Sequence, residues 1–376
     1  MTDRVHDLGD PYAFLTLPGF VPHLRTTLKL EALNPAGSIK LKTAREMLAA
    51  AEEEGLLGPG AALIESTSGN LGIALATLCA ATGHPLTLVT DPNTPAQSLR
   101  HMRALGAEVV VVTRRDAGGG YLQTRIDLIE DRLRSTPGLV WLNQYRNPAN
   151  ARAHQRHTMA EVLDGFGVPD WLFIGVGSTG TFMGCLQAVR EKRLATRVVA
   201  VDADGSVIFG GEPGRRFLPG LGASRRPELF ADDGSFTKVL VAERDTVRTC
   251  RRVARTYGLL PGASTGTALA AVTALAPDIP AGSRVLVIAP DLGDRYLSTL
   301  YDDAWVADTL GPDTLGPDTH GTHTHGTDTH GTDTLTTEPP EPLLTCPNSP
   351  YWPARTSSNS STDGRARSSP GSRTPI

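Results

Sequence analysis

The sequence predicts an α/β protein in which a parallel sheet is covered by helices on both faces. From about residue 60 onward, short apolar segments alternate with longer segments of helical periodicity, which is typical of parallel sheets. Several apolar segments are followed by runs of glycine, serine and threonine, which favour helix starts and anion binding. A chain of 376 residues is also long enough for two domains of ordinary size.

Each element follows from its local pattern. Strands are expected where aliphatic and β-branched residues form short runs, at 61–64, 86–90, 109–112, 139–142, 171–174, 198–201 and 284–289. Helices are expected where apolar residues recur at helical spacing, at 71–81, 95–105, 121–133 and 148–163. Residues 205–233 are rich in glycine, proline and arginine without periodicity, which predicts a long functional loop on the active-site side.

Composition argues against several classes of protein. The net charge of −4 disfavours nucleic-acid and membrane-surface binding, which call for basic patches or basic amphipathic helices. No segment approaches the roughly 20 apolar residues of a membrane span, and residues 1–10 lack the apolar centre of a signal peptide. We therefore expect a cytoplasmic protein. The cysteines show no CxxC spacing, so neither a zinc site nor a disulfide framework is indicated, and Cys79 and Cys185 are expected in the core.

The character of the chain changes after about Trp305. Short Gly-Pro-Asp-Thr, Gly-Thr-His and Gly-Thr-Asp units repeat there, followed by a Pro/Ser/Arg-rich end, so residues 306–376 are predicted to be a disordered low-complexity tail. Its histidines could in principle hold a metal, but ordering such a tract costs entropy and no second shell is evident. We therefore expect no metal site, including at the histidines His320, His323, His325 and His330.

The segment Asn34–Lys40 delivers a lysine to the first turn of a helix. Its turn residues end the preceding strand, Ser38 can cap the helix, and an apolar face over 44–51 continues it until Gly55. The helix dipole and partial burial favour a neutral amine at Lys40, which a Schiff base with a carbonyl cofactor requires. A surface lysine beside a turn is the alternative interpretation.

Two further segments place hydroxyl groups at helix starts. Ser66–Gly72 offers hydroxyls and backbone N–H groups to a carboxylate or phosphate, and the Asn70 amide can donate to an oxygen. Gly262–Gly266 opens another helix and could set the neutral hydroxyl of Ser264 against a heteroaromatic nitrogen. Simple helix capping is the alternative for both segments.

A third segment, Gly175–Thr181, has the features of a phosphate cradle. Its glycines let the backbone approach a ligand, and Ser178, Thr179 and Thr181 add hydroxyl groups ahead of a helix. The glycines also match G-x-G-x-x-G, with Asp202 about 20 residues on, so a dinucleotide-dependent oxidoreductase is a competing hypothesis. Against it, the match lies deep in the chain and leaves the lysine and the serine-rich segment without a role.

Together these segments resemble the fold type II (tryptophan synthase β-like) pyridoxal-phosphate enzymes, specifically the cysteine synthase branch, over about residues 12–305. The closing segment 290–299 also matches this family. The resemblance implies two α/β domains with parallel-rich twisted sheets and the cofactor between them. A smaller domain of roughly 45–145 would be inserted in a larger one formed by 12–44 and 146–305. It also implies a homodimer.

The resemblance further implies roles for individual residues. Lys40 would form the Schiff base with pyridoxal 5'-phosphate, Asn70 would reach the phenolic oxygen of the cofactor, and Ser264 would face its pyridine nitrogen. The cofactor phosphate would be held by Gly177, Ser178, Thr179, Gly180 and Thr181. The amino-acid substrate would be bound by Ser66, Thr67, Ser68, Gly69, Gln144, Gly220, Ser224 and Arg225.

Departures from the family pattern narrow the expected reaction. Leu71 replaces the second threonine of Thr-Ser-Gly-Asn-Thr-Gly, and Leu41-Lys42 replaces the usual Asp-Arg. The loops at 205–210 and 219–226 resemble a subgroup that condenses O-phospho-L-serine with L-glutamate, the first step towards 2,3-diaminopropionate for siderophores and peptide antibiotics. We therefore expect a transferase that replaces the β-substituent of an amino acid. A cysteine synthase acting on O-acetylserine or O-phosphoserine is the alternative, and a catalytically silent scaffold is disfavoured by the intact motifs.

Four cationic side chains are candidates for binding a phosphate leaving group or the carboxylates of glutamate, because guanidinium forks and ammonium groups suit both. For each arginine alone, a solvated surface role is the alternative. The candidates are Arg146, Arg225, Arg226 and Lys42.

Overall fold

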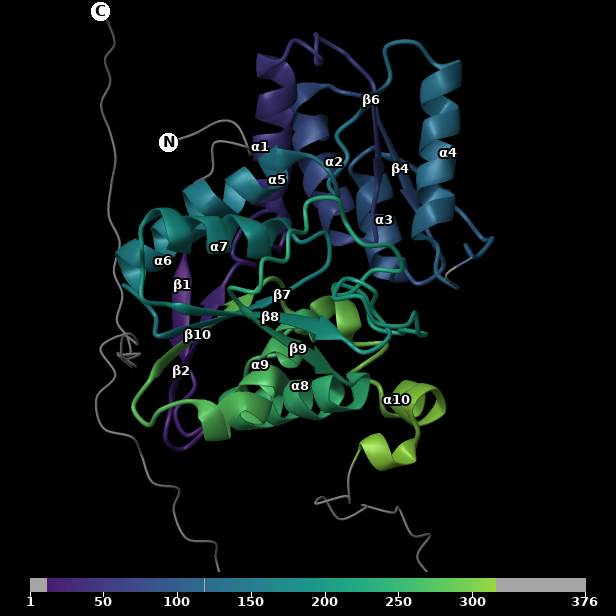
Figure 1. Cartoon of the computed structure of the whole chain (residues 1–376). Helices are drawn as coiled ribbons and strands as arrows, with labels where there is room; N and C mark the ends of the chain where they lie inside the picture. Colours follow the sequence, from purple (N-terminus) through teal and green to yellow (C-terminus); the bar gives the residue numbers. More distant parts are fainter. Residues whose placement is uncertain (1–11, 118, 316–376) are drawn as a thin grey trace, which may run out of the picture. The chain divides into compact units, whose positions relative to one another are not determined.

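The computed structural model describes residues 12–117 and 119–315 and contains two sheets (Figure 1). The larger sheet has the order β1-β2-β10-β7-β8-β9, and all its neighbouring strands are parallel except the antiparallel pair β1-β2. Its strands are β1 (Ala13–Thr16), β2 (Arg25–Leu30), β7 (Trp171–Gly175), β8 (Arg197–Ala203), β9 (Thr237–Val241) and β10 (Arg284–Ala289).

The smaller sheet is fully parallel, in the order β5-β4-β3-β6. Its strands are β3 (Leu63–Ser66), β4 (Leu86–Thr90), β5 (Glu108–Val111) and β6 (Val140–Trp141). The predicted α/β class with parallel-rich sheets is thus confirmed. All four strands fall inside 45–145, but the division of the chain into an inserted and an enclosing domain stays a prediction.

Helices follow the strands as the alternation predicts. Those beside the smaller sheet are α1 (Lys40–Glu53), α2 (Asn70–Thr82), α3 (Ala96–Ala104) and α4 (Leu122–Ser135). The others are α5 (Pro148–Ala153), a π-helical turn (His154–Thr158), α6 (Met159–Gly165), α7 (Gly180–Glu191), α8 (Glu243–Tyr257), α9 (Ala263–Leu275) and α10 (Asp303–Leu310), with short 3₁₀ turns at Ala276–Asp278, Gly293–Tyr296 and Pro312–Thr314. The single helix expected at 148–163 is therefore interrupted by the π-helical turn.

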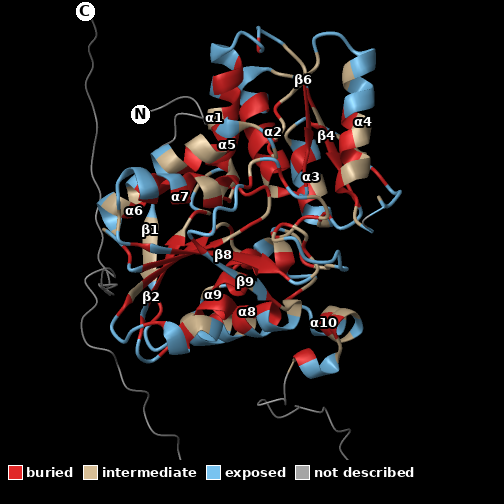
Figure 2. Ribbon diagram, viewed as in Figure 1, coloured by how far each residue is buried: buried red, intermediate tan, exposed pale blue. Residues whose placement is uncertain are grey.

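Both faces of the larger sheet are apolar because its strands alternate side chains between two cores. Phe173 and Val287 pack with α9, whereas Ile174 and Leu286 pack with α7 on the opposite face. In Figure 1, α8 and α9 cover one face of this sheet and α5 to α7 lie across the other. The inner strands β2, β7, β8 and β10 are accordingly mostly buried, whereas the edge strand β9 is largely exposed (Figure 2).

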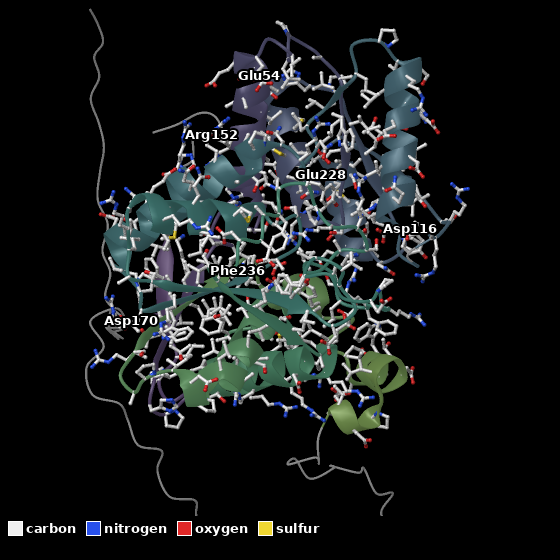
Figure 3. The ribbon with its side chains drawn as sticks, in the orientation of Figure 1. Glu54, Asp116, Arg152, Asp170, Glu228 and Phe236 are labelled. Atoms are coloured by element: carbon white, nitrogen blue, oxygen red, sulfur yellow. The ribbon has the colours of Figure 1, made fainter. Side chains whose placement is uncertain are left out.

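Side-chain exposure agrees with this layering. Phe236 is buried in the α7-side core, whereas Glu54 and Asp170 lie at the periphery (Figure 3). Cys79 and Cys185 are buried and unpaired, as predicted. In the described ranges, no helix combines the length and apolarity needed to cross a membrane.

Two local predictions differ from the structure. Helix α1 begins at Lys40 without a side-chain cap, because the Ser38 backbone instead forms an antiparallel bridge with Asp291. The boundary expected at residue 305 falls inside α10, whose Val306 and Leu310 are buried. The tail histidines named above lie outside the described residues.

Candidate active site

The loop before Lys40 is fixed by hydrogen bonds within itself and to the segment after β10. The Asn34 amide donates to the carbonyls of Glu31 and Ser38, both at 3.0 Å, and its side-chain oxygen accepts from the Ala36 N–H at 3.1 Å. The Ile39 N–H donates to the Pro290 carbonyl at 2.8 Å. This loop therefore presents Lys40 at a position determined by the segment after β10.

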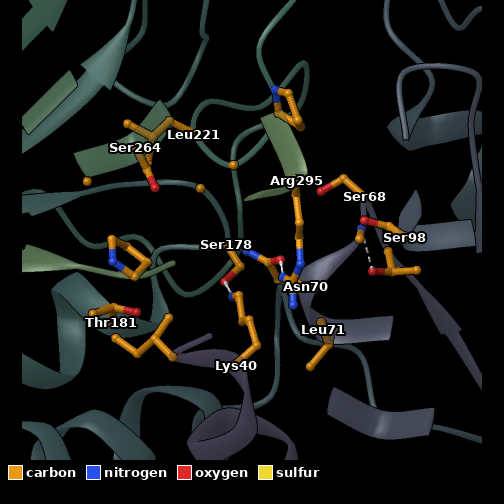
Figure 4. Close-up of a pocket in the computed structure, with 18 of the residues that line it drawn as sticks. Lys40, Ser68, Asn70, Leu71, Ser98, Ser178, Thr181, Leu221, Ser264 and Arg295 are labelled. Atoms are coloured by element: carbon orange, nitrogen blue, oxygen red, sulfur yellow. Dashed lines mark hydrogen bonds between the residues drawn. The ribbon is translucent and has the colours of Figure 1, made fainter. Parts of the chain in front are cut away.

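The Lys40 amine points into a cleft between polar groups (Figure 4). It donates to the Ser178 hydroxyl at 3.3 Å and to the Gln144 side-chain oxygen at 3.4 Å. Burial lowers the pKa of Lys40 to about 8, and the buried carboxyl of Glu65 opposes this shift. An appreciable fraction of the amine is therefore neutral near physiological pH.

The glycine-rich segment after β7 wraps around the start of α7. Thr179 has a left-handed backbone with φ of 66°, and its buried hydroxyl has no hydrogen-bond partner within the described residues. A Cβ atom at Gly177 would lie 3.1 Å from the Gly220 carbonyl, so the loop backbone packs closely against 219–221. A left-handed residue at a helix N-terminus directs successive N–H groups towards one point, which suits an anion.

Asn150 and His154 contact residues of this glycine-rich segment through their side chains. The Asn150 amide donates to the Ser178 hydroxyl at 3.1 Å, and its side chain fills the space where a Cβ of Gly180 would be. The His154 ring contacts the Thr181 hydroxyl at 3.2 Å, and burial holds the pKa of His154 well below its ordinary value. The side chains that hold this loop in place are therefore polar but uncharged.

A second hydrogen-bond network orients Asn70. Its side-chain oxygen accepts from Arg295, and its amide donates to the Asp291 carboxylate at 2.8 Å. Asp291 also accepts from the Tyr296 hydroxyl at 2.9 Å, and Arg295 donates to the Ala36 carbonyl at 2.6 Å. The start of α2, the lysine loop and the segment after β10 are thereby connected at one place.

Lys40, Asn70 and residues of the glycine-rich segment after β7 line a first cavity. The predicted site residues that line it are Lys40, Thr67, Ser68, Gly69, Asn70, Gln144, Gly177, Ser178, Thr179, Thr181, Gly220 and Ser264. Leu71, which departs from the family pattern, also lines it. Two other predicted residues do not line this cavity. Gly180 packs on Asn150, and Ser66 is buried at the end of β3.

A second cavity adjoins the first and shares Lys40, Ser68 and Gln144 with it. Arg125 and Arg216 line this second cavity, as does Ser224. Sequence reasoning missed both arginines. The structure therefore adds two positive charges to the predicted site, in a cavity that also borders Lys40.

The cationic residues proposed from the sequence lie elsewhere. Arg225 donates to Gln123 and pairs with Glu228, and Arg226 stacks over the Phe230 ring at 5.0 Å. Arg146 is exposed and lines neither cavity.

Lys42 is buried and bonds the carboxylates of Glu31 and Glu161, so it does not face the cavities. Burial alone would lower the pKa of Lys42, but these two carboxylates outweigh burial and raise it. Lys42 is therefore a structural cation.

Comparison with known proteins supplies the family. The sequence profile described as "Pyridoxal-phosphate dependent enzyme" matches residues 8–291. The N-(2-amino-2-carboxyethyl)-L-glutamate synthase of Ralstonia nicotianae is 43% identical over 280 residues, which cover 74% of this chain and 83% of that protein. The protein of the same name from Cupriavidus metallidurans is 41% identical over 283 residues, with the same coverage.

Solved structures agree with the sequence relatives. The crystal structure of O-ureido-L-serine synthase matches with a TM-score of 0.73 and 32% identity, covering 82% of this chain and 99% of that one. The O-acetylserine dependent cystathionine β-synthase from Helicobacter pylori matches with a TM-score of 0.72 and 30% identity, covering 80% and 98%. Since the profile spans most of the chain, the protein belongs to the family of pyridoxal-phosphate dependent enzymes.

Proposed function

We propose that this enzyme condenses O-phospho-L-serine with L-glutamate, forming N-(2-amino-2-carboxyethyl)-L-glutamate and releasing inorganic phosphate. The names of the two curated relatives support this reaction. The structural observation that carries it is Arg125, which is 6% exposed, lines the second cavity, and has Nε and Nη1 without hydrogen-bond partners in the described part of the chain. Its Nε forms an ion pair with the buried Asp91 carboxylate at 3.5 Å, without a hydrogen bond. Buried, unsatisfied guanidinium N–H groups favour an anionic substituent such as phosphate over a neutral acetyl group.

The first cavity fits pyridoxal phosphate. The unpartnered Thr179 hydroxyl and the close-packed backbone at Gly177 provide a cradle for a phosphate, and the largely desolvated Lys40 amine suits a Schiff base. We infer that 177–181 hold the phosphate, that Asn70 contacts the phenolic oxygen, and that Ser264 faces the pyridine nitrogen. When bound, the cofactor supplies an electron sink for the substrate α-carbon.

The chain itself then supplies binding and proton transfer. The N–H groups and hydroxyls at the start of α2, over 67–70, bind the α-carboxylate of the donor amino acid. Lys40, once free, takes the α-proton at its Nζ atom. Arg125 binds the phosphate substituent and stabilises it as it leaves the β-carbon. Ser264 offers a neutral hydroxyl, which favours elimination over transamination because it does not keep the ring nitrogen charged.

Product analysis tests this proposal. The purified enzyme with pyridoxal phosphate is offered O-phospho-L-serine or O-acetyl-L-serine, each with L-glutamate and sulfide in competition, and products are identified by mass spectrometry. We expect the glutamate adduct, formed from O-phospho-L-serine. Cysteine as the sole product would overturn the proposal and assign the protein to the cysteine synthases.

The lowered pKa of Lys40 predicts how cofactor binding depends on pH. Only the neutral amine attacks the cofactor aldehyde, so the rate of Schiff-base formation by the cofactor-free enzyme should rise with pH, reach half its maximum near pH 8 and level off above it. The appearance of the visible Schiff-base absorbance measures this rate, with free lysine as the control. A rate that keeps rising up to the ordinary lysine pKa of 10.5 would contradict the buried environment of the amine.

Replacing Arg125 tests the phosphate site. Arg125→Gln removes charge-assisted hydrogen bonds, so kcat/KM for O-phospho-L-serine should fall about 10- to 100-fold. The same quantity for O-acetyl-L-serine should change much less. The matched control is Arg132→Gln, on the exposed side of the same helix α4. Equal losses with both donors would contradict a phosphate site at Arg125.

The resemblance to the family also supports three further proposals. First, the protein is a homodimer. Second, it acts in the cytoplasm, and third, it serves 2,3-diaminopropionate synthesis for a siderophore or antibiotic. Light scattering after size-exclusion chromatography tests the first point. A mass equal to one chain would contradict it.

A further inference from the structure

Arg216 lies in the aperiodic loop 205–233 and lines the second cavity. Its Nη1 atom donates to the Gly205 carbonyl at 2.5 Å and to the Ala223 carbonyl at 3.4 Å. Its Nε atom packs against Gly222, where an added Cβ would come within 2.9 Å. Two carbonyls and a glycine thus fix the guanidinium, while its Nη2 has no hydrogen-bond partner among residues 12–117 and 119–315.

Burial lowers the pKa of Arg216, and the nearby carboxylates of Asp202, Glu243 and Asp116 oppose this shift, but none of them forms a direct ion pair with the guanidinium among the residues that the structure describes. Glu243 accepts from the backbone N–H groups of Phe217 and Leu218, the latter at 2.7 Å. Asp202 accepts from the Ala203 N–H at 2.8 Å. In the lining of the second cavity, two guanidinium groups face one carboxylate, Asp91. This wall therefore attracts a further anion.

The donor amino acid does not require this second arginine. In the proposed reaction its α-carboxylate lies at the start of α2 and its phosphate at Arg125. The incoming glutamate brings two more carboxylates, and the departing phosphate makes Arg125 available again. Arg216 is then the one cation of this cavity that binds the second substrate but not the first.

We propose that Arg216 is the specificity-determining residue for the acceptor and binds the side-chain carboxylate of a dicarboxylic amino acid. This assignment rests on the proposed condensation. It explains how a cavity open to a small nucleophile such as sulfide would favour a larger one that carries two carboxylates. The Nη2 group of the fixed guanidinium can donate charge-assisted hydrogen bonds to the side-chain carboxylate of glutamate, a group that sulfide lacks.

The experiment compares Arg216→Gln with wild type, using L-glutamate, its neutral isostere L-glutamine, and sulfide as acceptors. We expect Arg216→Gln to lower kcat/KM for glutamate about 10- to 100-fold, with a much smaller change for glutamine and sulfide. The ratio of kcat/KM for glutamate to that for glutamine should therefore fall by a similar factor. Phosphate release from O-phospho-L-serine in the absence of acceptor reports the donor half-reaction separately, and the visible cofactor spectrum reports whether the loop keeps its fold.

The matched control is Arg215→Gln, because the exposed neighbouring Arg215 stacks over the Phe217 ring at 4.5 Å and lines neither cavity. Arg216→Lys should restore only part of the preference, since an ammonium has a single nitrogen and cannot bond the two loop carbonyls and also reach a ligand as the guanidinium does. An unchanged glutamate-to-glutamine ratio in Arg216→Gln, or an equal loss in the donor half-reaction, would overturn this inference alone. Absence of any glutamate adduct in wild type would instead overturn the proposed function.

Discussion

Replacing Lys40 with alanine is expected to lower kcat for the condensation at least about a thousandfold, since in the proposed site one amine both anchors the cofactor and takes the α-proton. The variant should still bind pyridoxal phosphate through the 177–181 segment, but without the visible Schiff-base absorbance. Borohydride reduction followed by peptide mass spectrometry should label Lys40 in wild type.

The matched control is Lys192→Ala, which removes an exposed lysine at the end of α7. It should retain both absorbance and turnover. Schiff-base absorbance and turnover that persist in Lys40→Ala would assign the anchoring amine to another lysine and contradict the site described here.

Replacing Glu31 with glutamine is expected to lower the free energy of unfolding by about 3–5 kcal/mol, because it unbalances a buried group of charges. Glu31 accepts from Lys42 at 2.8 Å and also from Lys29, while Lys29 bonds Glu161 at 2.6 Å. The Glu31 side chain is 2% exposed and that of Lys29 is 0% exposed. Without the Glu31 charge, two buried ammonium groups would share one carboxylate.

Urea unfolding of the cofactor-saturated enzyme measures this loss. Glu53→Gln, on the exposed end of α1, is the control and should shift the free energy by less than about 0.5 kcal/mol. The double variant Glu31→Gln with Lys42→Met restores the charge balance, so it should lose less stability than Glu31→Gln alone. Additive losses would show that the charges are not coupled.

Much of the fold and part of the site could be predicted because they depend on local patterns. The strands at 86–90 and 284–289 coincide with the predicted ranges, since each is a short apolar run ending at turn residues. Strand β9 was not predicted, because at the sheet edge only its Val241 is buried and the apolar pattern is weak. Lys40 and Ser264 could be singled out because each lies in the first turn of a helix.

The arginines could not be found in this way. Arg125 lies within an amphipathic segment, where a cation is ordinarily read as part of the solvated face, and only the packing of α4 beside the smaller sheet turns it inward. Arg216 lies in a loop without periodicity, so its orientation depends on Gly222 and two carbonyls. Ser38 was predicted as a helix cap from its place just before the helix. Its backbone bridge to Asp291 could not be foreseen, because Asp291 is remote in the sequence.

The place of β10 in the larger sheet has a consequence for synthesis on the ribosome. Strand β10 joins β2 to β7, so the two parts of this sheet cannot be united until residues near the end of the folded region have left the exit tunnel. The smaller sheet, by contrast, draws only on residues 63–141 and can form earlier. Because Pro290 and Asp291 pair with the lysine loop, the proposed cofactor site can be completed only after these two residues have been synthesised.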